Sequence, residues 1–289
     1  MFAHMNFSAA LQHVSTRLRT IYEEGEANSI ANWVVESITG ASRQQSKVAN
    51  SVILTQAQEN QFHQVVERLL LHEPVQYVLN EAWFCGNKLY VDERVLIPRP
   101  ETEELVEWIS NDYTFPGNNI TILDIGTGSG CIPISLKKRL PNASVWGADI
   151  SEAALEVAKR NAASIDTEII FHHLDILNED NWSLLPPFDI IVSNPPYIPE
   201  KDKAQMQANV LQYEPAIALF VPDNDALLFY QAIGRFAKEK LTASGFLYVE
   251  IHEDLGKATT ELLRSMDFST TMKKDMQEKD RMIKSGLLK

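Results

Sequence analysis

Thr121-Ile-Leu-Asp-Ile-Gly-Thr-Gly-Ser-Gly130 joins an apolar run to three closely spaced glycines. Its apolar half predicts a buried strand, and its glycine half predicts a turn that leaves as a helix over residues 131–140. Glycine allows the backbone to approach a ligand closely, and the first N–H groups of a helix lack partners within it. The spacing differs from the Gly-x-Gly-x-x-Gly of dinucleotide folds, so it favours another adenosine-containing ligand. In residues 121–130, the candidates for contact with the cofactor are Asp124, Gly126, Thr127, Gly128, Ser129 and Gly130.

Two later apolar runs also end in acids. Residues 144–149 end in Asp149, and residues 168–175 end in Asp175. Ligands of open α/β sheets lie outside the carboxyl ends of the strands, where we expect both acids to be. Asp149 is predicted to accept hydrogen bonds from ribose hydroxyls, and Asp175 from an adenine amino group. Either single acid is equally compatible with a helix cap or a turn. Further candidates for cofactor contact are Ile150, Asn194 and, packing on the base, Ile176 or Trp182.

Asn-Pro-Pro-Tyr at residues 194–197 follows a fourth apolar run, residues 188–193, that also predicts a buried strand. Proline fixes its own φ and biases the preceding residue toward extended geometry, so the Asn194 side chain and the Pro195 carbonyl can face one small volume. Both are acceptors, and together they can hold the two hydrogens of a planar NH2 group. The alternative is an ordinary proline-terminated strand end. We predict a site for a planar nitrogen built from Asn194, Pro195, Pro196 and Tyr197, with the Tyr197 ring offering a flat face.

Composition narrows the class of protein. The chain has 289 residues, 45% of them apolar, enough for one full domain and a smaller one. It contains no apolar run of membrane-spanning length and no basic region before an apolar run at its start, so we expect a cytoplasmic enzyme. Cys85 and Cys131 lack metal-ligand spacing and are expected to be free thiols. The net charge of −13 argues against duplex DNA as the main partner, because DNA binding requires Lys and Arg at the phosphates.

The first part of the chain is predicted to be helical. Apolar residues recur at helical spacing over residues 11–21 and 62–70, and Pro74 is expected to end the last of these helices. The periodicity leaves open whether these helices recognise a protein partner or only pack on a catalytic domain. We expect a helical domain at residues 1–75.

A hairpin and a stiff loop should follow this domain. The hairpin is predicted to turn near Gly86-Asn87 within a linker at residues 76–97, which leads into a catalytic domain at residues 98–289. In Ile-Pro-Arg-Pro-Glu-Thr-Glu, residues 97–103, two prolines flank Arg99, and Thr102 is expected to cap the next helix. This loop is predicted to lie across the cofactor and substrate pocket, with Arg99 holding backbone or acidic groups nearby. The alternative is a plain turn with a surface arginine. Toward the end of the chain we expect a helix at 225–240, a strand at 245–251, a helix at 254–266 and a hairpin at 268–288.

The glycine turn, the ribose acid and Asn-Pro-Pro-Tyr together resemble the class I S-adenosylmethionine-dependent methyltransferases that modify a planar nitrogen. Adenine-N6 DNA enzymes and glutamine-N5 protein enzymes share that chemistry. Three further stretches make residues 70–250 similar to the release factor glutamine methyltransferases, the HemK/PrmC family. They are Glu73-Pro-Val-Gln-Tyr-Val-Leu79, Trp83-Phe84 and Leu96-Ile-Pro-Arg-Pro-Glu-Thr-Glu103. The Asp280-Arg281 pair in the terminal hairpin also matches the family.

This resemblance implies an α/β fold, a Rossmann-like methyltransferase sheet with a small N-terminal helical domain and a connecting β-hairpin. It implies S-adenosyl-L-methionine as cofactor and the glutamine of the Gly-Gly-Gln loop of peptide chain release factors as substrate, recognised with help from the N-terminal helices. We expect a monomer that binds neither nucleic acid nor membrane. The alternatives are methylation of a ribosomal-protein glutamine, methylation of a DNA or RNA amino group, and a cofactor-binding module without catalysis.

Overall fold

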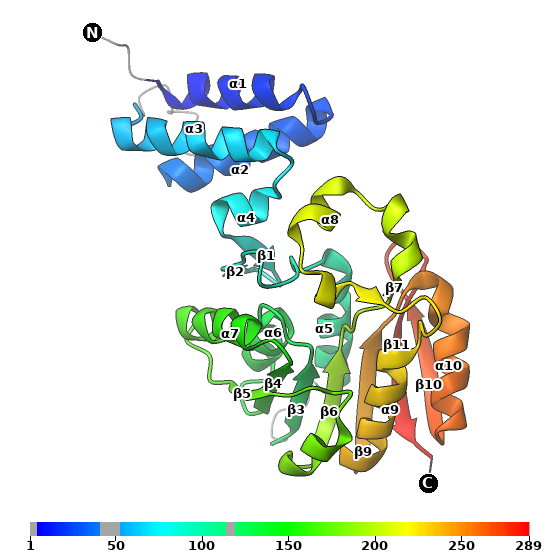
Figure 1. Cartoon of the computed structure of the whole chain (residues 1–289). Coiled ribbons are helices and arrows are strands. Elements are labelled where there is room, and N and C mark those ends of the chain that lie inside the picture. The colour runs from blue at the N-terminus through cyan, green and yellow to red at the C-terminus, as the bar shows by residue number, and fades with distance from the viewer. Residues whose placement is uncertain (1–4, 41–52, 114–118, 289) are drawn as a thin grey trace. The chain divides into compact units, whose positions relative to one another are not determined.

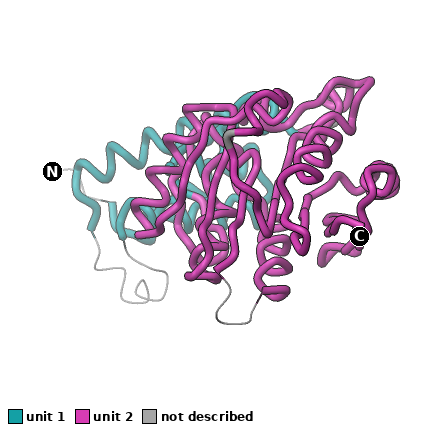
Figure 2. Tube along the Cα trace, turned by 90° about the horizontal axis from the view of Figure 1, so that it is seen from below, with its two compact units in different colours: residues 1–81, 207–213 teal, residues 82–206, 214–289 magenta. Residues whose placement is uncertain are grey.

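The computed structural model describes residues 5–40, 53–113 and 119–288 and divides into two compact units (Figure 2). The first unit comprises Met1–Glu81 and Gln207–Tyr213, and the second comprises Ala82–Met206 and Glu214–Lys289. The boundary between the two units falls between residues 81 and 82. The helical domain was expected to end at residue 75.

The first unit is helical, as predicted (Figure 1). Its helices are α1 (Phe7–Leu18), α2 (Glu24–Thr39), α3 (Gln56–Leu70), α4 (Val75–Leu79) and α8 (Ala208–Tyr213). The apolar stripes of α1 and α3 are largely buried, with Val14 and Phe62 in the shared core. The Tyr213 hydroxyl donates to the Leu71 carbonyl at 2.9 Å, which ties α8 to the end of α3.

The expectation that Pro74 ends the last of these helices was wrong. α3 already ends at Leu70, and Pro74 is instead the N-cap of the short helix α4. A proline is well tolerated at the start of a helix, where its missing N–H would have no helical partner. The segment that was expected to begin the linker therefore continues the helical unit.

A mixed parallel and antiparallel sheet forms the centre of the second unit (Figure 1). Among the described residues it has seven strands in the order β10-β11-β9-β6-β3-β4-β5. The neighbours from β9 to β5 are parallel, whereas β11 pairs antiparallel with both β9 and β10. The strands are β3 (Thr121–Ile125), β4 (Ser144–Asp149), β5 (Ile170–His173), β6 (Phe188–Ser193), β9 (Leu241–Glu250), β10 (Phe268–Lys274) and β11 (Asp280–Leu287).

Helices cover both faces of this sheet. Alternate residues of β3 illustrate the arrangement, since Ile122 packs with α5–α7 and Leu123 packs with α9 and α10. Burial on both faces explains why the central strands read as nearly continuous apolar runs. The helices are α5 (Pro100–Asp112), α6 (Cys131–Arg139), α7 (Glu152–Ser164), α9 (Leu228–Lys240) and α10 (Gly256–Ser265). Short 3₁₀ helices are η2 (Glu179–Leu184), η3 (Glu200–Gln205), η4 (Ala216–Ala218) and η5 (Glu253–Leu255).

Two short strand pairs complete this unit, β1 (Ala82–Phe84) with β2 (Asn87–Leu89) and β7 (Ile198–Pro199) with β8 (Phe220–Val221). The β1–β2 hairpin was predicted, but its turn lies one residue earlier than expected. Cys85 and Gly86 both have positive φ, 48° and 73°, and Asn87 already belongs to β2. Two consecutive positive φ values match the twist of a tight hairpin, and a cysteine at the first position gives no sequence signal for it.

In the described part of the chain, none of the helices has both the length and the apolar character needed to cross a bilayer.

Candidate active site

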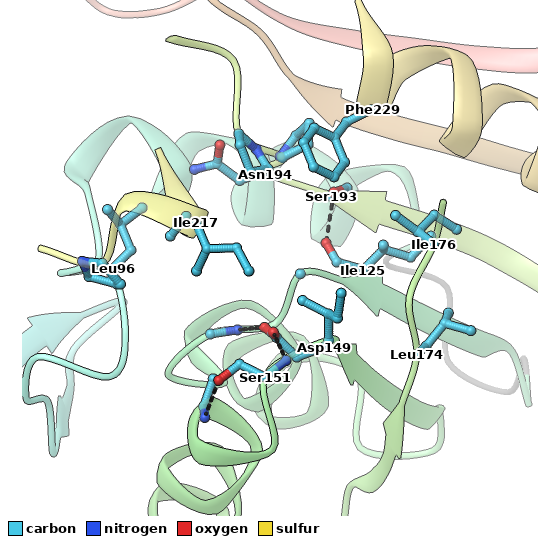
Figure 3. Close-up of a pocket in the computed structure, with 18 of the residues that line it drawn as sticks. Leu96, Ile125, Asp149, Ser151, Leu174, Ile176, Ser193, Asn194, Ile217 and Phe229 are labelled. Carbon is cyan, nitrogen blue, oxygen red and sulfur yellow. Dashed lines mark hydrogen bonds between the residues drawn. The ribbon is translucent and has the colours of Figure 1, made fainter. Parts of the chain in front are cut away.

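A cavity of about 280 Å³ lies where the carboxyl ends of the parallel strands meet in the second unit (Figure 3). Asp149 and Asn194 lie on opposite sides of it. The Ser193 hydroxyl donates to the Ile125 carbonyl at 2.7 Å and ties the end of β6 to the end of β3. Seven of the predicted cofactor residues line the cavity, namely Gly126, Gly128, Asp149, Ile150, Asp175, Ile176 and Asn194.

The glycine turn is bound to the end of the neighbouring strand. The N–H groups of Gly126 and Thr127 both donate to the Ala148 carbonyl, at 2.8 and 2.9 Å. Gly126, Gly128 and Gly130 have φ values of 76°, 52° and 79°, in the left-handed region that glycine adopts readily. Because these N–H groups already donate to a backbone carbonyl, they are not available to bind an anion. The turn instead allows a ligand to approach the backbone closely.

Asp149 ends β4 at the cavity and has two backbone donors. Its Oδ2 accepts from the Gly128 N–H and its Oδ1 from the Ser151 N–H, each at 2.9 Å. Burial raises the pKa of Asp149, and these backbone hydrogen bonds oppose that shift. Each carboxylate oxygen retains a free acceptor position, so the fixed carboxylate can receive two adjacent hydroxyls.

The structure separates the two candidates for packing on a base. Ile176 lines the cavity, whereas Trp182 is only 2% exposed and lies in the core beneath it. The Trp182 indole N–H donates to the Ile176 carbonyl at 3.2 Å, and its ring packs edge-on against Phe236. The prediction that Trp182 lies in the pocket is therefore corrected, because its side chain turns into the core and supports Ile176 from behind. Asp175 lies at the cavity just after β5, and its Oδ1 accepts from the Leu177 N–H at 2.9 Å.

Besides Trp182, four predicted cofactor residues do not line the cavity: Asp124, Thr127, Ser129 and Gly130. Asp124 is fully buried on β3, and among the described residues neither carboxylate oxygen has a hydrogen-bond partner. Burial raises the pKa of Asp124 to about 7. A buried carboxylate without a partner is costly, and a nearby cation relieves that cost. The cavity wall beside Asp124 therefore fits a positively charged cofactor.

Asn194, Pro195 and Pro196 line the opposite side of the cavity. The Asn194 Nδ2 donates to the Thr102 hydroxyl at 3.1 Å, and that hydroxyl donates to the Glu250 Oε2 at 2.6 Å. Tyr197 does not line the cavity, and its ring packs edge-on against His252 with 5.8 Å between centroids. Three of the four residues of the predicted planar-nitrogen site thus meet at the cavity.

The prediction that Thr102 caps its helix was wrong. The helix α5 begins at Pro100 with Arg99 as its N-cap, because proline suits the first helical position. Thr102 therefore lies inside the first turn, and its buried hydroxyl contacts Asn194 and Glu250. Neither contact has a signal in the local sequence.

Arg99 lies near the cavity without lining it. Its guanidinium donates to the buried Glu214 Oε1 at 2.7 Å, and Glu214 Oε2 accepts from the Ile97 N–H at 3.2 Å. Leu96 and Ile217, which flank this ion pair in the chain, both line the cavity. The ion pair therefore joins two segments of the cavity wall.

A mixed seven-stranded sheet with a terminal antiparallel hairpin, and a cavity at the carboxyl ends of its parallel strands, define the fold of the class I S-adenosylmethionine-dependent methyltransferases. Residues 101–216 match the Methyltransferase small domain family, and residues 9–79 match the PrmC N-terminal domain. The chain is 46% identical to the release factor glutamine methyltransferase of Flavobacterium psychrophilum, over 92% of this chain and 94% of that protein. It is 38% identical to that of Bacteroides thetaiotaomicron, over 94% and 96%. The chain belongs to the release factor glutamine methyltransferase family.

Proposed function

We propose that this chain methylates the side-chain N5 of the glutamine in the Gly-Gly-Gln motif of peptide chain release factors. Membership of the family supports this substrate. The observation that carries the chemistry is the orientation of Asn194, whose Nδ2 is engaged by Thr102 while the residue lines the cavity. Its carbonyl oxygen is thereby left to accept from an incoming amide.

The described residues fit S-adenosyl-L-methionine. Asp149 would hold the ribose hydroxyls, Asp175 the adenine amino group and Ile176 a face of the base. The partnerless Asp124 carboxylate favours the positive charge of this cofactor. When bound, S-adenosyl-L-methionine supplies a methyl group activated by its sulfonium.

The chain's own residues address the weakness of an amide as a nucleophile. The lone pair of an amide nitrogen is delocalised into its carbonyl. In our proposal Asn194 Oδ1 and the Pro195 carbonyl accept the two N–H hydrogens and orient the nitrogen for in-line transfer. The same two acceptors stabilise positive charge as it develops on that nitrogen, so no strong base has to act first, and one N–H proton leaves after the methyl group has been transferred. Pro196 holds the turn rigid. Tyr197 lies outside the cavity against His252 and supports this turn instead of stacking on the amide, while Arg99 contributes to the substrate site through the wall that it braces.

We further propose the biological setting from the remaining features. The N-terminal helical domain contributes to release factor recognition. The net charge of −13 supports a protein substrate in preference to nucleic acid. The enzyme acts as a monomer in the cytoplasm.

The proposal is tested by offering alternative substrates in parallel. The purified chain is incubated with labelled S-adenosyl-L-methionine and recombinant release factors, a ribosomal protein fraction or DNA, and the label is mapped by peptide mass spectrometry. One methyl group on the Gly-Gly-Gln glutamine is the expected result. Label confined to a ribosomal protein or to DNA would overturn the substrate, and absence of label would overturn the catalytic assignment.

A further inference from the structure

A buried hydrogen-bonded chain runs behind the cavity wall from Glu250 to Thr102 to Asn194. Glu250 ends β9, Thr102 lies in the first turn of α5, and Asn194 follows β6. The Thr102 Oγ1 is 2.6 Å from the Glu250 Oε2 and 3.1 Å from the Asn194 Nδ2. Glu250 and Thr102 are both buried. Neither lines the cavity, so their effect on the reaction must pass through Asn194.

When Glu250 is ionised, the hydrogen bonds between Asn194, Thr102 and Glu250 can run in only one direction. A carboxylate only accepts hydrogen bonds, and a threonine hydroxyl has one proton to donate. Thr102 gives that proton to Glu250 and retains only lone pairs for Asn194. The Asn194 NH2 must therefore face Thr102, and its carbonyl oxygen must face the other way. The two ends of a side-chain amide have nearly the same shape, so hydrogen-bond partners decide between them.

We propose that Glu250, acting through Thr102, fixes the orientation of the Asn194 amide and so keeps Asn194 an acceptor for the substrate N–H group. Glu250 and Thr102 are positioning residues, and the proposal rests on the function proposed for Asn194. A flipped amide would present its NH2 to the substrate NH2, and two donors cannot pair.

The surroundings of Glu250 allow its charge to change near neutral pH. In the ranges that the structure describes, no Lys, Arg or His nitrogen lies within 4.0 Å of its carboxylate. Burial raises the pKa of Glu250 to about 7, with Glu101 of α5 adding to the rise. The Thr102 hydrogen bond and the charges of Arg281 on β11 and of Arg99 oppose it. Tyr197 and Tyr230 also face Glu250, and burial raises the pKa of both phenols, so they stay neutral.

Protonation of Glu250 removes the constraint. A neutral Glu250 carboxyl group can donate to the Thr102 hydroxyl. Thr102 can then donate its own proton to Asn194, whose amide flips so that its carbonyl oxygen accepts that proton. The fraction of enzyme with Asn194 as an acceptor therefore falls as pH drops through about 7. Turnover at saturating cofactor should fall with it.

Three threonine variants of the full chain test the role of the hydroxyl. Thr102→Val keeps the shape and removes both hydrogen bonds, and we expect kcat for release factor methylation to fall about tenfold or more. Thr102→Ser restores the hydroxyl and should recover most of kcat. Thr259→Val is the matched control, because Thr259 on α10 is buried and its hydroxyl has no partner among the described residues. S-adenosyl-L-methionine Kd and Tm are measured for each variant.

Glu250→Gln tests the direction of these hydrogen bonds through the pH profile of kcat. A glutamine side chain can donate or accept and does not titrate, so kcat should be reduced and its fall below about pH 7 should disappear. Full kcat in Thr102→Val, or the wild-type acid limb persisting in Glu250→Gln, would overturn the inference. If Thr102→Val does not fold, the Glu250→Gln profile decides alone. A wild-type chain that methylates no glutamine would instead overturn the proposed function.

Discussion

The guanidinium of Arg99 donates to the buried carboxylate of Glu214 over 2.7 Å, across 115 residues of chain. The Glu214 side chain is 1% exposed and that of Arg99 is 34% exposed. Each residue lies beside a segment of the cavity wall. Loss of this ion pair should therefore change the geometry of the substrate site and also destabilise the fold.

Arg99→Ala should lower the free energy of unfolding by about 2 kcal/mol, because it leaves the Glu214 charge buried without its cation. The cost should be below that of a fully buried pair, because solvent reaches Arg99. Arg235→Ala is the matched control, since its pair with Glu179 is exposed on both sides and should contribute less than about 1 kcal/mol. Urea denaturation measures both variants. Equal losses in the two would contradict a special role for Arg99.

Trp182→Phe should affect stability more than cofactor binding. It removes the indole N–H that donates to the Ile176 carbonyl, and we expect a loss of about 1 kcal/mol in the free energy of unfolding. Ile176→Ala removes cavity wall and should weaken S-adenosyl-L-methionine binding directly. Calorimetric Kd values alongside denaturation curves separate the two effects. A larger change in Kd for Trp182→Phe than for Ile176→Ala would contradict this prediction, because it would indicate that the adenine base packs on Trp182.

Asp149→Asn should weaken S-adenosyl-L-methionine binding about 10- to 100-fold, because one acceptor of a charged, backbone-anchored carboxylate becomes a donor. The new NH2 would also face an N–H of Gly128 or Ser151. Isothermal titration calorimetry measures the change in Kd. At saturating cofactor, methyl transfer should be largely retained, and an unaltered Kd would exclude Asp149 from the ribose site.

The motif residues could be predicted from sequence because each requires a local backbone shape. Gly126, Gly128 and Gly130 occupy positive φ, and the prolines at 195 and 196 stiffen the turn after β6. Thr102 has no comparable signature, since its role depends on Glu250, which lies 148 residues further along the chain. Only the packing of α5 against the sheet brings the two together.

The choice between Ile176 and Trp182 shows the same limit of local reasoning. Both are apolar residues that follow the strand predicted at 168–175, and the sequence does not encode which side chain turns into the core. The hairpin turn at Cys85 was misplaced for a different reason. Cysteine adopts positive φ there without belonging to the residue types that usually mark such turns.

Stability without cofactor should fall as pH rises from about 4 to 7. Asp124 has an ordinary pKa near 4 when unfolded and one raised to about 7 when folded, so the folded state keeps its proton while the unfolded state loses it. The expected slope reaches about 1.4 kcal/mol per pH unit for one such group. Urea denaturation at pH 5 and 8 should show this loss, with a smaller loss in Asp124→Asn. The remaining slope should reflect Glu250, whose raised pKa acts with the same sign. A wild-type protein more stable at pH 8 would contradict the buried, partnerless state of Asp124.

In our proposal Asn194 acts above all as an acceptor for the substrate amide, and the cofactor is held mainly by other residues of the cavity. Asn194→Ala removes that acceptor while leaving Asp149, Asp175 and Ile176 in place at the cavity. By analogy with the loss of one oxyanion-hole donor, the barrier should rise by about 3 kcal/mol.

The most direct measurement is therefore the single-turnover rate of release factor methylation by Asn194→Ala at saturating S-adenosyl-L-methionine, with cofactor Kd determined on the same sample. We predict a rate reduced by about 100-fold and an unchanged Kd. A rate close to that of the wild type, or a loss that disappears once the cofactor site is saturated, would contradict the claim.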